Sequence, residues 1–176
     1  ENFRRQIKEY FVPLAEKMHD KRRERLGLEK LSYIDENMYF VDGNPKPQGT
    51  PEEIMANGQK MYEELSPETK EFFDFMMENE LFDVLGRKTK KAGGYMTYLP
   101  KYRAPFIFAN FNGTSGDVDV VTHECGHAFQ GYVYGSDPIE EHWDITMETA
   151  EIHSMSMEFF TEPWLSLIHI SEPTRQ

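Results

Sequence analysis

The chain has 176 residues, and its 19 lysines and arginines against 31 aspartates and glutamates give a net charge of −12. Such acidity argues against binding to nucleic acid or to an anionic membrane surface, because phosphate groups would be repelled. Hydrophobic residues make up 39% of the chain and aromatic residues 14%, which predicts a packed core rather than a disordered acidic segment.

The sequence lacks the features of a secreted or membrane protein. No apolar run approaches the roughly 20 residues that span a bilayer. The first ten residues are charged and do not resemble a signal peptide. The single cysteine, Cys125, excludes an internal disulfide and is typical of a reducing compartment. We therefore expect a cytoplasmic protein without a membrane partner.

Both ends of the sequence look cut. A helical apolar pattern starts at once after Glu1, so we expect the chain to begin inside a longer protein. Residues 165–176 resemble the translation of a transposase sequencing adapter, and we exclude them from reasoning about the fold. The alternative is a natural apolar segment that is closed by a turn containing proline. These observations predict that residues 1–164 are the native part.

The first 50 residues are predicted to form a helix and then a loop. Apolar side chains recur at helical spacing over residues 1–26, with a break or kink at Pro13. Residues 40–50 are rich in glycine, proline and asparagine, which indicates a loop.

Two further helices have recognisable starts. Thr50 precedes Pro51 and stands three residues before Glu53, a pattern typical of a capping box. Ser66 and Pro67 begin the next helix in the same way. The phenylalanine and methionine stripes of these helices are interpreted as core.

The segment 93–111 has a different pattern. Its residues alternate in hydrophobicity and include a turn, which predicts two short strands. Gly93 and Gly94 come just before the first strand, where glycine can admit a close backbone approach or simply form a turn. The chain as a whole is therefore expected to be mainly α, with a short two-stranded β element before the next helix.

That next helix contains the sequence His123-Glu124-Cys125-Gly126-His127, an H-E-x-x-H motif. On a helix, His123 and His127 lie on one face, one turn apart, so both imidazoles can reach one metal ion. Glu124 lies beside them and can take the proton of an attacking water. Zinc suits this donor set, since it binds two nitrogens and a carboxylate and leaves a fourth coordination position for an exchangeable water. We expect one zinc ion per chain.

A second helix, predicted to start near Asp144, supplies candidates for a third ligand. Glu151 can fold back toward the histidines and complete a site of two histidines and one glutamate. Glu148 and Glu158 can orient a ligating imidazole, or can instead form ordinary surface ion pairs. We expect the helix to bury an apolar stripe of four residues, Ile145, Ile152, Met155 and Phe159.

These motifs resemble a known family. The sequences HECGHAFQ at 123–130 and EIHSMSME at 151–158 are similar to the oligoendopeptidase F branch of the thimet-oligopeptidase-like zinc metallopeptidases, as are GNPKP at 43–47 and NGTSGDVD at 112–119. The resemblance covers nearly all of residues 1–164. It implies a zincin-like, mostly helical peptidase domain that cleaves oligopeptides inside a deep channel.

The same resemblance implies roles for individual residues. His123, His127 and Glu151 correspond to the zinc ligands and Glu124 to the general base. Gln130 stands where the thimet-type enzymes carry a third histidine, which fits the oligoendopeptidase F branch and removes no ligand. The family places carbonyl-polarising histidine and tyrosine residues well downstream of the metal site, and this chain stops before them.

The predicted function is a zinc-dependent endopeptidase acting on oligopeptides. We expect the substrate to lie antiparallel to an exposed strand edge within 94–111, close to Gly93 and Gly94. Tyr134 is a further candidate to line the cleft, on the same helix face as the two histidines. Two alternatives stay open: a zinc-binding fragment that lacks catalysis, and a purely structural helical module. The sequence does not define an oligomeric state.

Overall fold

The computed structural model describes residues 1–44, 46–47 and 49–165, apart from the side chain at position 140. The chain divides into two compact units, Glu1–Asn44 and Pro45–Gln176, which are described separately. The predicted non-native segment 165–176 lies outside the described residues except for Leu165. In the described part of the chain, no helix is both long and apolar enough to cross a membrane.

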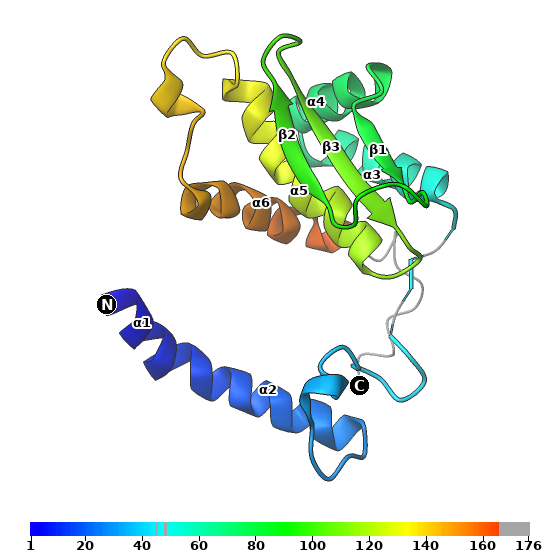
Figure 1. Ribbon diagram of the computed structural model, residues 1–176, viewed down its shortest axis with the longest axis vertical. Coiled ribbons are helices and arrows are strands. Elements are labelled where there is room, and N and C mark those ends of the chain that lie inside the picture. Colours follow the sequence, from blue (N-terminus) through cyan, green and yellow to red (C-terminus); the bar gives the residue numbers. More distant parts are fainter. Residues whose placement is uncertain (45, 48, 166–176) are drawn as a thin grey trace. The chain divides into compact units, whose positions relative to one another are not determined.

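The first unit consists of one long interrupted helix and a short loop region (Figure 1). It runs as α1 (Asn2–Gln6), a π-helical turn (Ile7–Phe11) and α2 (Val12–Arg25), followed by a 3₁₀ turn at Tyr33–Asp35. The π turn ends just before Pro13, because a proline has no N–H to continue the α-helical hydrogen bonds. The predicted interruption at Pro13 is therefore confirmed. Most apolar side chains of this interrupted helix are exposed, Phe3 to 76%, whereas Ile7 is half-buried.

The second unit begins with two helices whose starts follow the prediction. In α3 (Pro51–Leu65), Thr50 Oγ1 accepts a hydrogen bond from the backbone N–H of Glu53, and the Glu53 carboxylate accepts one from the N–H of Thr50. Ser66 caps α4 (Pro67–Glu78) through the N–H of Thr69. Both caps satisfy N–H groups that a helix leaves without partners in its first turn.

The β element has three strands rather than the predicted two. Strands β2 (Tyr95–Leu99) and β3 (Ala104–Phe111) pair antiparallel, as expected. The additional strand β1 (Phe82–Leu85) pairs parallel with β3, so the order is β1-β3-β2. A strand of four residues is too short to show a period-two pattern, and its pairing depends on residues more than 20 positions away. The mainly α fold class is confirmed with this correction.

The core lies between these elements and the long helix α5 (Gly116–Tyr134), which runs along β2 and β3 (Figure 1). The core is made of fully buried aromatic and aliphatic side chains, among them Tyr62, Phe72, Phe73, Met76, Ile107, Val118 and Val121. The hydroxyl of Tyr62 donates to the backbone oxygen of Val121 at 3.0 Å. One face of α5 therefore packs against the core, and the opposite face carries polar side chains.

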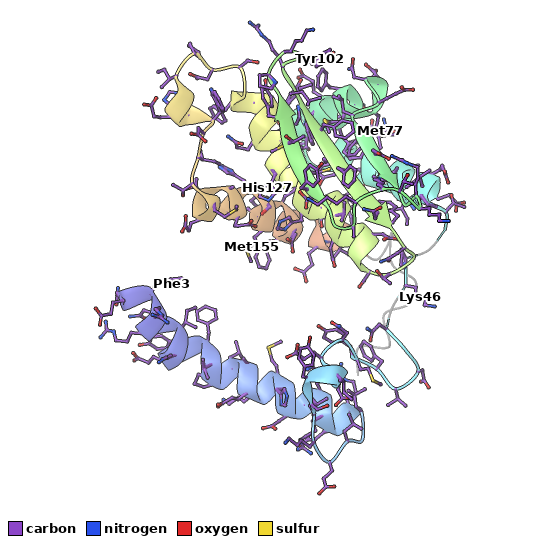
Figure 2. All side chains as sticks on the ribbon, viewed as in Figure 1. Phe3, Lys46, Met77, Tyr102, His127 and Met155 are labelled. Carbon is purple, nitrogen blue, oxygen red and sulfur yellow. The ribbon has the colours of Figure 1, made fainter. Side chains whose placement is uncertain are left out.

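The last helix, α6 (Met147–Thr161), lies beside α5, is capped by Thr146, and is followed by a 3₁₀ turn at Glu162–Trp164. A separate 3₁₀ turn at Glu140–His142 lies in the connection between α5 and α6. The predicted apolar stripe of α6 is wrong: Ile152, Met155 and Phe159 are exposed, and Met155 projects away from the sheet (Figure 2). The buried residues are instead Ser154, Met157 and Thr161. Their side is buried because α6 approaches α5 closely there, and hydrophobic periodicity alone does not register such an approach.

Candidate metal centre

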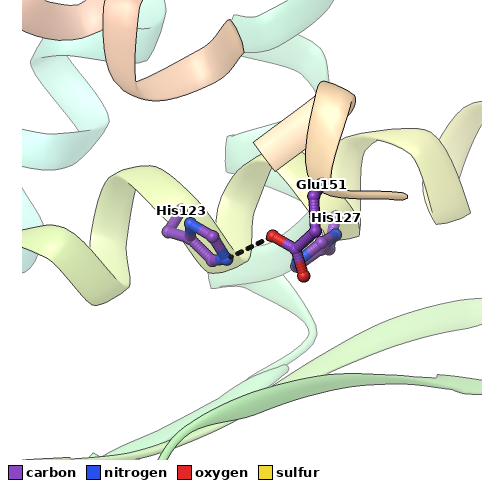
Figure 3. A group of neighbouring side chains, drawn as sticks. All are labelled: His123, His127 and Glu151. Carbon is purple, nitrogen blue, oxygen red and sulfur yellow. Dashed lines mark ion pairs between the residues drawn. The ribbon is translucent and has the colours of Figure 1, made fainter. Parts of the chain in front are cut away.

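Helix α5 brings the two motif histidines together. His123 and His127 stand one turn apart, and their rings are 4.9 Å apart between centroids, at an angle of 81°. Glu151, from the first turns of α6, reaches the same point (Figure 3). Its carboxylate lies 3.3 Å from His123 Nε2 and 3.9 Å from His127 Nε2. One donor atom from each of the three residues thus lies within 4.8 Å of the other two.

This arrangement fits a metal ion. Ligands about 2.0–2.1 Å from a tetrahedral zinc stand about 3.3 Å from one another. The distance from Glu151 to His123 equals this value, and the distance from Glu151 to His127 is longer, at 3.9 Å. The side chains are partly exposed, between 15% for His127 and 40% for Glu151. The cluster is therefore anchored on two helices and is still accessible to solvent.

Each histidine also contacts a group outside the three-residue cluster. Glu158 Oε1 lies 2.5 Å from His123 Nδ1, which leaves Nε2 turned toward Glu151. The backbone carbonyl of Ala150 accepts a hydrogen bond from the His127 ring. Burial, followed by the charge of His123, lowers the pKa of His127. A lowered pKa favours the neutral imidazole, the form that binds a metal.

Glu151, the third candidate ligand, is held in place by hydrogen bonds from Ser154. Ser154 is fully buried, and its Oγ donates to Glu151 Oε2 at 3.0 Å and to the backbone oxygen of Glu151 at 3.2 Å. Carboxylates that ligate metals are commonly held by such hydrogen bonds. The sequence reasoning missed Ser154, although its place one turn after Glu151 is a usable signal.

Glu124 lies between this cluster and the sheet. It is half-buried, and the backbone N–H of Met96 in β2 donates to its carboxylate. Burial is the largest influence and raises the pKa of Glu124, with a smaller contribution from the charge of Glu151, while His123 and the Met96 hydrogen bond oppose it. A carboxyl group with a raised pKa beside a candidate metal position is suited to accept a proton.

The other predicted residues are placed differently. Glu148 is exposed in the first turn of α6 and forms no ion pair with either histidine, whereas Glu158 does. Gly93 has a backbone φ of +99°, which favours glycine and gives it a turn role before β2. Gly94 has no close backbone neighbour that would exclude a side chain. Tyr134 is the last residue of α5 and is half-exposed.

Comparison with known proteins identifies a family for the chain. The family model described as Peptidase family M3 matches residues 50–176, most of the chain. The chain belongs to peptidase family M3. No curated protein matches it.

Several solved structures resemble this family M3 chain. A structure named for an oligoendopeptidase F of Bacillus anthracis strain Ames has a TM-score of 0.90 and 53% identity, over 95% of this chain and 31% of its own. The structure named PZ peptidase A with inhibitor 2 has a TM-score of 0.89 and 56% identity, over 95% of this chain and 30% of its own. A Chlamydophila abortus peptidase structure, at 20% identity and a TM-score of 0.65, shares the fold. The chain thus spans about a third of the length of the first two.

Proposed function

We propose that this chain carries the zinc-binding part of a metalloendopeptidase that hydrolyses peptide bonds in oligopeptides. The observation that carries the proposal is the convergence of His123, His127 and Glu151 on one point, with the half-buried carboxyl of Glu124 beside it. Two imidazoles and one carboxylate are a donor set that catalytic zinc sites use, with the fourth position left for water or substrate. Membership of peptidase family M3 supports the same reading.

In this proposal Glu124 moves the protons. Zinc, when bound, supplies a Lewis acid that makes an attacking water acidic near neutral pH. Glu124 takes the proton from that water and then gives it to the leaving amine of the cleaved peptide bond. The burial that raises its pKa makes the carboxylate a stronger base, which favours the first of these two steps.

Strand β2 is the proposed platform for the substrate. Within the described part of the chain, the order β1-β3-β2 leaves β2 with one unpaired edge, and the N–H of Met96 in β2 donates to Glu124. A peptide that adds to such an edge binds through backbone hydrogen bonds, so many sequences are accepted. Oligopeptides are therefore the proposed substrate class, and Gly94, at the start of this edge, is a candidate contact. The positive φ of Gly93 is already explained by the turn.

Cleavage of a quenched oligopeptide tests the proposal. It is measured for this chain and for a longer chain that continues to the length of the related structures. In the active form, Glu124→Gln is expected to lower the rate at least about 100-fold while zinc stays bound, because general acid–base catalysis contributes about that much or more. Glu148→Gln, an exposed carboxylate on α6, is the matched control and is expected to leave the rate unchanged.

The outcomes separate the alternatives. Cleavage by the longer chain alone would identify the present chain as a zinc-binding part without activity of its own. An unchanged rate for Glu124→Gln would refute the role of Glu124. No cleavage by either chain, with zinc bound, would refute the peptidase assignment.

A further inference from the structure

A close approach between α5 and α6 lies inside the H-E-x-x-H motif. A Cβ atom placed on Gly126 would stand 2.5 Å from Ser154 Cα, 2.8 Å from the backbone oxygen of His153 and 3.0 Å from Met157 Cβ. The first two of these are backbone atoms, which cannot swing away as the end of a flexible side chain can. Gly126 has an ordinary helical φ, so the glycine serves close approach rather than an unusual conformation.

This contact lies next to all three candidate ligands. Gly126 stands between His123 and His127 on α5, and Ser154 follows Glu151 by one turn of α6. Ser154 also donates to the Glu151 carboxylate at 3.0 Å. The spacing of the two helices at this point therefore determines how far Glu151 stands from the imidazoles.

We propose that Gly126 and Ser154 are positioning residues that preset the third ligand. Gly126 lets α6 approach α5, and Ser154 fixes the Glu151 carboxylate where the two histidine nitrogens face it. The inference deepens the proposed function and rests on its metal site. It assigns a reason to the glycine within the H-E-C-G-H sequence that metal coordination itself does not require.

The expected displacement is large compared with what a metal site tolerates. Carbon atoms in contact stand about 3.5–4.0 Å apart. A methyl group on Gly126, at 2.5 Å from Ser154 Cα, therefore pushes α6 away by about 1 Å. Ligand distances in a formed metal site vary by about 0.2 Å. Glu151 would no longer meet the ion together with both histidines.

The test compares two glycine substitutions in the same helix. Gly126→Ala is expected to weaken zinc binding at least about 100-fold in a chelator competition and to change the visible absorption of Co²⁺ bound in place of zinc. Gly131→Ala is the matched control, since its Cβ meets only side-chain atoms at 3.5 Å or more. Alanine is favoured over glycine inside a helix, so Gly131→Ala is expected to keep the zinc affinity of the parent.

A second pair of variants decides the matter if Gly126→Ala does not fold. Ser154→Ala removes only the hydroxyl and is expected to weaken zinc binding about 10-fold and to shift the Co²⁺ absorption, as loss of a group that holds a ligand does. Ser156→Ala, on the same helix and only half-buried, is the control and is expected to change neither.

The results distinguish this inference from the proposed function. If the parent chain binds no zinc, both are refuted. If the parent binds zinc and folded Gly126→Ala binds it as tightly, with the same Co²⁺ absorption, the positioning role alone is refuted. Parental binding by Ser154→Ala would refute the same role for Ser154.

Discussion

Replacing Glu158 with glutamine tests how the metal site is oriented. Glu158 Oε1 lies 2.5 Å from His123 Nδ1, a charge-assisted hydrogen bond that leaves His123 Nε2 turned toward Glu151. Glutamine keeps the size and an acceptor oxygen but loses the negative charge. The substitution therefore removes the electrostatic part of the contact and leaves its shape.

The size of the effect follows from the exposure of the pair. Loss of a group that orients a metal-binding histidine weakens metal affinity by about 10- to 100-fold. The Glu158 side chain is 42% exposed and that of His123 is 29% exposed, so solvent screens part of the interaction. We expect the lower end of the range, about 10-fold, which corresponds to about 1.4 kcal/mol of binding free energy.

Zinc affinity is measured by chelator competition on the 176-residue chain. Glu148→Gln is the matched control, because it lies on the same helix, is exposed and has no ion pair with either histidine. We expect a weaker zinc affinity for Glu158→Gln and an unchanged zinc affinity for Glu148→Gln. Equal affinities for both variants and the parent would refute it.

Three predictions concern stability. The Lys90 side chain is 1% exposed, pairs with Asp83 and donates to three backbone oxygens. Lys90→Met is therefore expected to lower the free energy of unfolding by about 2–4 kcal/mol in urea titrations, whereas Lys91→Met, at an exposed position, is expected to change it hardly at all. The Arg87 guanidinium, with Lys90, lowers the pKa of Asp83 from 3.8 to about 2. The stability that Asp83 contributes is therefore full above about pH 4 and is lost as the pH falls toward 2. Urea titrations across that pH range are expected to show this loss in the parent and not in Asp83→Asn. Met157→Ala should lower the unfolding free energy by about 2 kcal/mol or more, whereas Phe159→Ser should change it by under about 0.5; equal losses would contradict the observed face of α6.

The sequence predicted the parts of the fold that depend on local chemistry. The helix caps at Thr50 and Ser66 depend only on neighbouring residues, and both caps are present as predicted. The inner face of α5 follows a helical apolar period, and Val121 and Cys125 are buried accordingly. The facing of His123 and His127 needs only helical geometry, since residues four apart share one side.

The parts that were missed depend on distant partners. Strand β1 is defined by its parallel pairing with β3, for which four residues carry no periodic signal. The buried side of α6 is set by the approach at Gly126, where a glycine and a serine rather than large apolar residues form the contact. Glu158, and not Glu148, pairs with His123 because of the way α5 and α6 cross. The local sequence of α6 does not determine this crossing.

Zinc content tests the central claim most directly. The purified chain, loaded with zinc and passed through a desalting column, is expected to retain one zinc ion, measured by atomic emission. The double substitution His123→Ala with His127→Ala is expected to retain none, and His142→Ala, whose histidine pairs with Asp137, is expected to retain one. One tightly bound zinc in the double variant would contradict the assignment of the site.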